Sequence, residues 1–226
     1  MLAARWPDDI RGKKKYDHPK WHYINYPFKP AGQPDSVKPA EPGEENIVQA
    51  YRLNLKQVQK GTGEEQAVAL CWLFHLIGDV HQPLHVTSLF TTDYPNGDKG
   101  GNLVFIRVKE GNKPIKLHFF WDGLILGSMN VTTVRNLAAK LRARPEFARD
   151  KLTELKETDF EKWAKVESFG QAREVAYLDG KLKGGKDADS APVLPAGYAK
   201  KAKAVAERRI VLAGYRLADL LKREVK

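Results

Sequence analysis

The chain has 226 residues, of which 42% are hydrophobic and 29% are charged. This balance supplies enough apolar material for a sizeable core, and it excludes both a wholly disordered chain and a disulfide-stapled miniprotein. Lysine and arginine outnumber aspartate and glutamate by 38 to 28, and the net charge of +10 suits an anionic partner such as nucleic acid, or equally a solvated basic surface. The single cysteine, Cys71, cannot form an intrachain disulfide and is expected to be a buried, inert thiol.

The sequence predicts neither a membrane span nor an export signal in the chain as given. Its longest weakly polar stretch, residues 67–78, is shorter than the roughly 20 residues that cross a bilayer, and it contains His75. Near the amino terminus, Arg5, Asp8 and Asp9 carry charge where a signal peptide would have its apolar centre.

Hydrophobic periodicity predicts a mainly α fold, beginning with two helices in the first half of the chain. Residues 44–58 have apolar side chains at helical spacing after the loop signal Pro42-Gly43. Residues 64–79 follow, and they are apolar on nearly every face, which is typical of a helix at the centre of a bundle. The Pro-rich residues 29–43 are expected to form a loop.

The second half of the chain adds a hairpin and more helices. Apolar and polar side chains alternate over residues 103–108 and 115–119, on either side of Glu110-Gly111-Asn112, which predicts a short β-hairpin and the only sheet. Helical periodicity is found again in residues 130–141, 159–177 and 197–221. Residues 179–190, rich in Gly, Lys and Asp, are expected to be a loop inside a single domain that spans residues 1–226.

Histidine and aspartate recur at a spacing that suits a metal ion. His75 and Asp79 lie four residues apart on the predicted central helix, so their side chains leave one face on successive turns. The same spacing recurs at His118 and Asp122, where the hairpin gives way to a predicted helical turn.

Three further residues extend this set. His85 lies six residues beyond Asp79, after Gln82-Pro83 ends the helix, and Asp8 and His22 add a carboxylate and an imidazole near the amino terminus. Imidazole nitrogen with carboxylate oxygen and no thiolate is the composition of a catalytic zinc site, and more than four such ligands imply more than one ion.

Each histidine alone has a structural alternative, because a single histidine in an apolar helix is more often a hydrogen-bonded core residue than a ligand. Asp79 is different. An ionised carboxylate at a helix end with few polar neighbours needs a cation or a hydrogen-bond donor to offset its desolvation.

Three motifs follow one another along the chain: FHLIGDVHQPLHV (residues 74–86), GDKGGN (97–102) and LHFFWD (117–122). In order and spacing they resemble the zinc-dependent single-strand nucleases of the mung bean nuclease type, which also act as 3'-nucleotidases. WPDDIR (6–11) and WHYINYPF (21–28) are similar to upstream segments of the family, so the resemblance covers almost the whole chain. It implies a mainly α domain of the zinc-dependent phospholipase C and nuclease fold, with one short β-hairpin.

The resemblance also implies two ligand sets. The first zinc would be bound by Asp8, His22, His75 and Asp79, and the second by His85, His118 and Asp122. In the family a third zinc shares the aspartate equivalent to Asp79 and uses a histidine and a first-residue tryptophan near the mature amino terminus. This chain opens with Met1-Leu2-Ala3. We therefore expect an amino-terminally truncated domain that binds about two zinc ions.

The implied reaction is hydrolysis of phosphodiester bonds in single-stranded RNA or DNA, leaving a 5'-phosphate, with removal of 3'-phosphate from nucleotides. Zinc supplies a nucleophile at neutral pH and holds phosphate oxygens. Asp8 would both bind zinc and orient the attacking water, and Arg11 would donate hydrogen bonds to the charge developing on phosphorus. The alternative for Arg11 is a surface salt bridge with Asp8 or Asp9.

Two residues are implied to bind substrate and one to support the ligands. Tyr23 resembles the family's aromatic stacking position, although a buried core tyrosine is an alternative. Asn102 of the GGN motif resembles a nucleotide-binding amide. His81 is not among the family's ligands and is expected to make a hydrogen bond behind them.

Two other functions stay open at this point. One is a zinc-dependent phospholipase C, and the other is a relic or fragment that binds zinc or nucleic acid without turnover. The family's members are exported, which implies a secreted or periplasmic protein.

Overall fold

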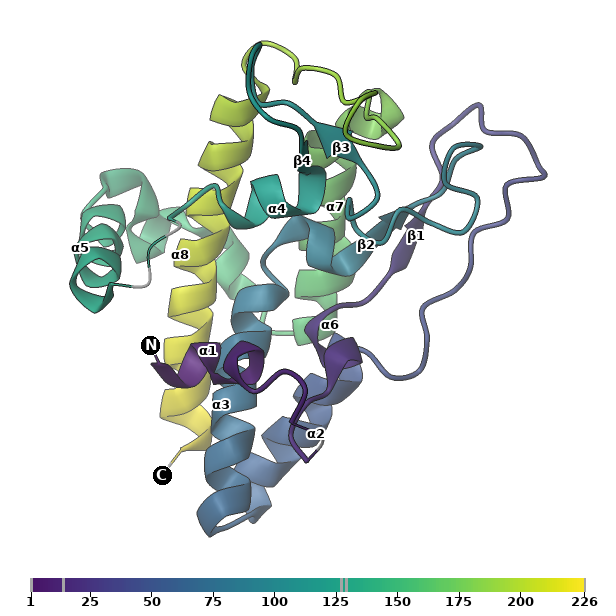
Figure 1. The fold of residues 1–226 in the computed structure, drawn as a ribbon. Helices are drawn as coiled ribbons and strands as arrows, with labels where there is room; N and C mark the ends of the chain where they lie inside the picture. The colour runs from purple at the N-terminus through teal and green to yellow at the C-terminus, as the bar shows by residue number, and fades with distance from the viewer. Residues whose placement is uncertain (1, 14, 127, 129, 226) are drawn as a thin grey trace.

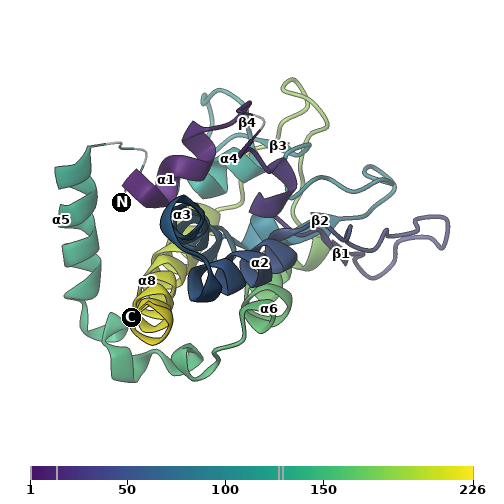
Figure 2. The ribbon, with the colours of Figure 1, turned by 90° about the horizontal axis from the view of Figure 1, so that it is seen from below.

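The central helix α3 (Gly63–Asp79) is the element around which the other long helices pack. The computed structural model describes residues 2–13, 15–126, 128 and 130–225. Figures 1 and 2 show α3 with three helices around it: α1 (Leu2–Asp9), α2 (Ile47–Lys60) and α8 (Tyr198–Glu224). The buried residues of α3 include Trp72, Leu73, Leu76 and Ile77, which confirms the predicted central position of this helix.

Helices α2 and α3 form where the periodicity predicts them. The side chain of Asn46 accepts hydrogen bonds from the backbone N–H groups of Val48 and Gln49, at 2.9 and 3.2 Å, and so fixes the start of α2. Helix α1 was not predicted, because its eight residues contain Pro7 and three charged side chains.

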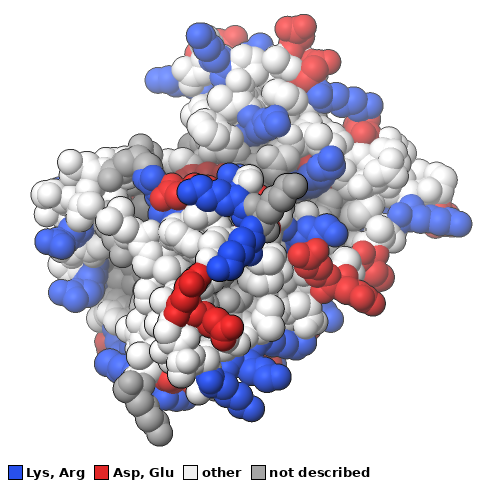
Figure 3. Space-filling model, turned by 60° about the horizontal axis from the view of Figure 1, so that its bottom comes forward, with Lys and Arg blue, Asp and Glu red and all other residues white. Residues whose placement is uncertain are grey.

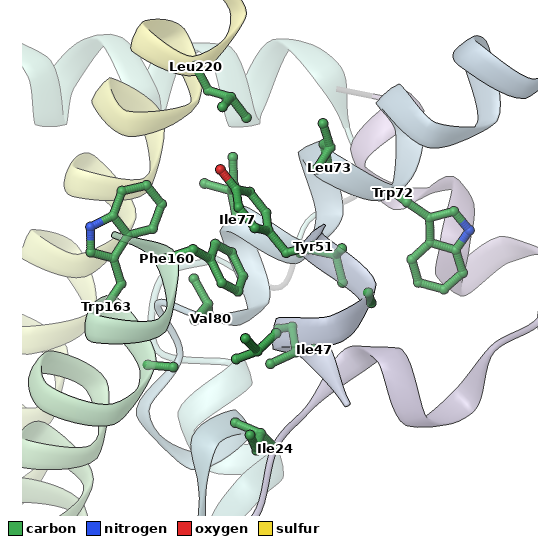
Figure 4. Packing of buried hydrophobic residues seen from close by; sticks show 14 of the residues in the cluster. Ile24, Ile47, Tyr51, Trp72, Leu73, Ile77, Val80, Phe160, Trp163 and Leu220 are labelled. Atoms are coloured by element: carbon green, nitrogen blue, oxygen red, sulfur yellow. The ribbon is translucent and has the colours of Figure 1, made fainter. Parts of the chain in front are cut away.

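Aromatic and aliphatic side chains from both halves of the chain fill the largest core cluster (Figure 4). The rings of Tyr51 and Phe160 are stacked with centroids 3.9 Å apart. Ile77 of α3 and Leu220 of α8 are buried in the same cluster. Burying one such aliphatic side chain stabilises the fold by about 1.5–3 kcal/mol, so this cluster sets the position of α3.

The predicted helix over residues 159–177 is present but irregular. It comprises α6 (Phe160–Lys162), the π-helical η6 (Trp163–Ser168), α7 (Phe169–Gln171) and the π-helical η7 (Ala172–Ala176). The first π-helical segment presents Glu167 to two arginines of α8. The guanidinium groups of Arg209 and Arg216 lie 2.5 and 2.6 Å from its carboxylate.

A parallel strand pair corrects the expectation that the hairpin is the only sheet. Strand β1 (Tyr26–Phe28) pairs with β2 (Thr87–Leu89), with Tyr26 opposite Thr87. Three residues are too few to show alternation, and the pairing joins segments about 60 residues apart. Next to this strand pair, the backbone N–H of Ile24 donates to the carbonyl of His85 at 2.8 Å. The segment that follows His22 therefore lies beside His85.

The predicted hairpin is confirmed in a shorter form. Strands β3 (Phe105–Ile106) and β4 (Ile115–Lys116) are antiparallel. The second strand ends early because the following residues form helix α4 (Leu117–Asp122), in which Leu117, Phe120 and Trp121 are buried at helical spacing.

The remaining segments are a helix, short turns and loops. Helix α5 (Val131–Arg142) packs against α8 at the outside of the molecule (Figures 1 and 2). Residues 29–43 contain no helix or strand, as predicted. The short helical turns are η1 (Pro19–His22), η2 (Pro83–Val86), η3 (Pro145–Phe147), η4 (Arg149–Lys151), η5 (Thr153–Lys156) and η8 (Leu178–Gly180).

Three predictions concern surface and membrane properties. Cys71 is half-buried rather than buried, and burial raises the pKa of its thiol, which disfavours the reactive thiolate.

No helix among the described residues is long and apolar enough to span a membrane. Figure 3 shows lysine and arginine side chains spread over one face with acidic side chains between them, so the positive charge is not gathered there into one continuous patch.

Candidate metal centre

Histidine and aspartate side chains from separate parts of the chain meet in two clusters. The first cluster contains Asp8, His22 and His75, and the second contains His85, His118 and Asp122. In each cluster the candidate ligand atoms all lie within 4.8 Å of one another. Helices α1 and α3 and the turn η1 supply the first cluster, while η2 and α4 supply the second.

Asp79 lies between the two clusters. Its Oδ2 is 2.9 Å from His75 Nε2, one helical turn earlier on α3, and 3.2 Å from His22 Nδ1. The same oxygen lies 3.7 Å from His85 Nδ1. Burial alone would raise the pKa of Asp79, but the neighbouring His85, His75 and His22 outweigh burial and hold this pKa far below its usual value. The carboxylate therefore stays ionised.

Backbone carbonyls fix the orientation of three of the imidazoles. The Nδ1 atoms of His75, His85 and His118 lie 2.8, 2.9 and 2.7 Å from the carbonyl oxygens of Ala4, His22 and Gly100, respectively. A carbonyl oxygen can only accept, so each Nδ1 carries the proton and donates it. The Nε2 atoms are the ring nitrogens turned toward the clusters, which is the orientation seen for metal-binding histidines whose Nδ1 donates to a carbonyl.

The second cluster is completed by Asp122 at the end of α4. Its two carboxylate oxygens lie 3.7 Å from His85 Nε2 and 3.6 Å from His118 Nε2. The rings of His85 and His118 are stacked with centroids 4.9 Å apart. Burial would raise the pKa of Asp122, yet the adjacent His85 and His118 lower it overall.

The residues present fit a bound metal ion. His22 Nε2 is buried without a hydrogen-bond partner among the described residues, while its Nδ1 lies 2.7 Å from His75 Nε2. The His22 and His75 imidazoles and the Asp79 carboxylate converge in this site. This set of donors suits a cation, since imidazole and carboxylate ligands without thiolate are common for divalent metals.

The GDKGGN segment builds the support for His118. Gly100 has φ +61°, and a Cβ on it would lie 2.2 Å from the carbonyl oxygen of Leu84. Only glycine fits there, and its carbonyl receives the His118 hydrogen bond.

Asp98 anchors the same loop and was not predicted as part of the site. Its side chain is fully buried and accepts hydrogen bonds from the backbone N–H groups of Leu89 and Gly101 and from the Tyr177 hydroxyl, at 2.8, 2.9 and 2.6 Å. Burial raises the pKa of Asp98, and these donors offset part of the shift. Its place inside the GDKGGN motif was the signal that could have found it.

One cavity of about 950 Å³ is lined by residues of both clusters. Of the predicted site residues, those that line it are Asp8, Arg11, His22, Tyr23, Asp79, His85, Asn102, His118 and Asp122. His75 is buried behind them in contact with His22. The sequence did not single out Lys99, Lys116 and Phe119, which line the same cavity.

The residues predicted to act beside the metals have definite partners. Arg11 Nη2 lies 2.7 Å from Asp8 Oδ1, so the salt bridge considered as its alternative is formed, at the edge of the cavity. Asn102 donates through Nδ2 to the Lys99 carbonyl at 2.9 Å. Tyr23 is 39% exposed and is therefore not a buried core tyrosine.

His81 lies outside the cavity lining, and its hydrogen bonds run elsewhere than predicted. Its Nδ1 donates to the Ile77 carbonyl at 2.7 Å, and Arg216 Nη1 donates to its Nε2 at 2.8 Å. Neither ring nitrogen therefore supports a cluster residue, because Nδ1 bonds to the Ile77 carbonyl and Nε2 to the buried Arg216. Burial, Arg209 and Arg216 hold the pKa of His81 well below its usual value, so the ring is neutral and accepts from Arg216.

Comparison with known proteins supports a nuclease. A family model described as S1/P1 Nuclease matches residues 1–226. Endonuclease 1 of Arabidopsis thaliana is 27% identical over 237 residues, which cover 96% of this chain and 72% of that protein. Endonuclease 4 of the same plant is 43% identical over 60 residues, covering 26% of this chain and 17% of that protein. Endonuclease 2 of the same plant is 28% identical over 130 residues, which cover 54% of this chain and 41% of that protein. The matched segments thus cover less than half the length of two of these three relatives.

Proposed function

The chain belongs to the S1/P1 nuclease family, and from this premise we propose that it is a zinc-dependent nuclease of single-stranded RNA and DNA. Its products would carry a 5'-phosphate, and it would also remove the 3'-phosphate of nucleotides. The observation that carries the proposal is the position of Asp79, which joins two imidazole and carboxylate clusters beside one cavity.

The chain's own residues prepare this cavity for a phosphate ester. The two clusters would hold zinc, which would supply Lewis acidity and a nucleophile at neutral pH. The backbone carbonyls of Ala4, His22 and Gly100 fix the imidazoles before substrate arrives, so no ligand has to reorganise during the reaction.

Arg11 and Asp8 form the polar pair nearest to the reacting phosphate in this proposal. The guanidinium donates to Asp8 when the cavity is free and would turn to the phosphate oxygens when substrate binds. Asp8 Oδ1 would then accept from the attacking water and orient it toward phosphorus. The pair is exposed enough to rearrange, since the side chains of Arg11 and Asp8 are 66% and 43% exposed.

Preference for single strands would follow from Tyr23. Its exposed ring lines the cavity beside the first cluster and can stack on a nucleobase. A duplex covers the faces of its bases, so stacking on Tyr23 requires an unpaired base or the energy to unpair one. Asn102 lines the same cavity, and because its Nδ2 donates to the Lys99 carbonyl, it would recognise the stacked nucleotide through its amide oxygen.

The phospholipase C alternative is less well supported, because the matched family and relatives are nucleases. The test is hydrolysis by the zinc-loaded chain of single-stranded DNA, a matched duplex and phosphatidylcholine vesicles. We expect cleavage of the single strand, slower cleavage of the duplex and none of the lipid, with activity lost in chelator. Lipid hydrolysis without DNA cleavage would support the phospholipase. Zinc binding without any hydrolysis would support the non-catalytic alternative.

A further inference from the structure

The two exposed aromatic side chains among the described residues both lie at the candidate metal centre. Phe119 is 66% exposed and Tyr23 is 39% exposed, while the other described aromatic residues are buried or half-buried. An apolar ring that stays in water costs free energy unless a ligand covers it. Both rings line the 950 Å³ cavity, so both are available to one substrate.

Helix geometry explains why Phe119 leaves the core. Successive residues of an α-helix are rotated by about 100°, so His118 and Asp122 share one face of α4. Leu117, Phe120 and Trp121 occupy the buried face. Phe119 falls between these faces, next to Asp122, and projects at the edge of the cavity.

Each metal cluster therefore has its own aromatic neighbour. Tyr23 directly follows His22 of the first cluster, and Phe119 directly follows His118 of the second. Asp79 lies between the two clusters, so the Tyr23 and Phe119 rings lie beside different clusters of one continuous group of polar side chains.

Two lysines accompany Phe119. Lys99 and Lys116 are exposed, line the cavity, and form no ion pair with a described acidic residue. Lys99 adopts the left-handed conformation, with φ +57°, between the buried Asp98 and Gly100. The hydrogen bonds of Asp98 hold this loop in place, which keeps a cation beside the second cluster.

We propose that Phe119, Lys116 and Lys99 form a second nucleotide subsite, so that the cavity holds two nucleotides of one strand on either side of the cleaved bond. This proposal rests on the proposed nuclease function. Tyr23 would take one base and Phe119 the other, while the lysines would bind the phosphate beyond the second base. The second subsite would therefore contribute to the binding of an oligonucleotide and not to that of a 3'-mononucleotide, which fills only one position.

The test compares an oligonucleotide with a 3'-mononucleotide, because only the oligonucleotide reaches both subsites. Phe119→Ala should lower kcat/KM for single-stranded DNA about tenfold, the effect of losing one stacked base, and should affect the 3'-mononucleotide several-fold less. Phe119→Trp should restore the oligonucleotide rate, whereas Phe119→Leu, which is apolar without an aromatic face, should not. Val166→Ala removes an exposed apolar side chain outside the cavity and serves as the control.

A binding measurement gives a second readout that does not require turnover. The affinity of the full chain for labelled oligothymidylate in chelator should fall about tenfold in Phe119→Ala. Replacing Lys116 and Lys99 by glutamine should each reduce the slope of log affinity against log salt by about 0.7.

The outcomes separate this proposal from the proposed function. If the wild-type chain cleaves both substrates and Phe119→Ala loses equal activity on both, the second subsite is refuted while the nuclease stands. If Phe119→Ala binds oligothymidylate as tightly as the wild type, the subsite is also refuted, and the exposed ring serves something other than a nucleic acid. If the zinc-loaded wild type hydrolyses neither substrate, the proposed function itself fails.

Discussion

The backbone carbonyl of His22 accepts a hydrogen bond from Nδ1 of His85 at 2.9 Å, so a residue of the first cluster orients an imidazole of the second. The link is possible because the segment after His22 runs beside the segment after His85, as β1 and β2 pair in parallel. The two clusters are therefore coupled through main chain as well as through Asp79.

Removing one ligand should nevertheless empty only one cluster. We expect the purified 226-residue chain to bind about two zinc ions, since the seven donors form two groups. His118→Ala should remove one ion and His22→Ala the other, as measured by metal analysis after removal of loose zinc. His18→Gln, which alters a histidine outside both clusters, is the control. Three tightly bound ions, or loss of both ions from His118→Ala, would contradict this assignment.

Gly100→Ala should disrupt the site more than an ordinary glycine substitution does. A left-handed conformation costs about 1–2 kcal/mol for an alanine, and at Gly100 the added Cβ also meets the Leu84 carbonyl at 2.2 Å. Gly111 has φ +75° with no heavy atom within 4 Å of such a Cβ, so Gly111→Ala isolates the conformational cost. Urea unfolding should show a larger loss for Gly100→Ala, together with weaker zinc binding through His118. Equal losses would show that the contact with Leu84 relaxes freely.

Tyr177→Phe should expose the dependence of the GDKGGN loop on Asp98. The variant deletes the hydroxyl that donates to the buried carboxylate at 2.6 Å, and the cost is about 1–3 kcal/mol while Asp98 is ionised.

The effect should depend on pH with a defined sign. Burial raises the pKa of Asp98 in the folded state above the unfolded value, so the folded state binds more protons in that window and stability falls as pH rises through it. Loss of the Tyr177 donor raises the folded pKa further. The difference in unfolding free energy between wild type and variant should therefore shrink as pH is lowered through the pKa of Asp98. A difference that grows on acidification would contradict the assigned role.

The buried network of α8 offers a stability test away from the metals. Glu167→Gln leaves Arg209 and Arg216 buried without a balancing carboxylate and should cost about 3–5 kcal/mol. Glu161→Gln breaks the exposed pair with Arg52 and should cost less than about 1 kcal/mol. Denaturant unfolding of both variants provides the comparison, and similar losses would mean that the Glu167 carboxylate is replaceable.

Local patterns predicted the central helix and the histidine and aspartate residues that the structure brings together in two clusters. Helix α3 was predictable because its apolar residues are contiguous, and the His75 and Asp79 spacing already places both side chains on one face. Strands β1 and β2 were not predictable, since strands of three residues show no periodicity and the two strands that pair lie far apart along the chain.

The exposed ring of Phe119 shows where local patterns fail. The sequence does not distinguish the two phenylalanines of LHFFWD, which are chemically alike. The alternation of apolar and polar side chains over residues 115–119 predicts that Phe119 belongs to the second strand of the hairpin. Helix α4 begins at Leu117 instead, which buries Phe120 and exposes Phe119. The hydrogen bond of His81 Nε2 was likewise not predictable from local patterns, because its partner Arg216 lies 135 positions away and belongs to no motif near His81.

The most direct test of the proposed function is a zinc titration of the metal-free chain with single-stranded DNA as substrate. Bound zinc and cleavage rate should rise together until about two ions are held, and Asp79→Asn, which removes the charge between the clusters, should lower the rate by at least about 100-fold. Asp150→Asn, an exposed aspartate far from the cavity in sequence and outside its lining, should titrate like the wild type. Cleavage that proceeds without zinc, or that Asp79→Asn leaves unchanged, would contradict the account.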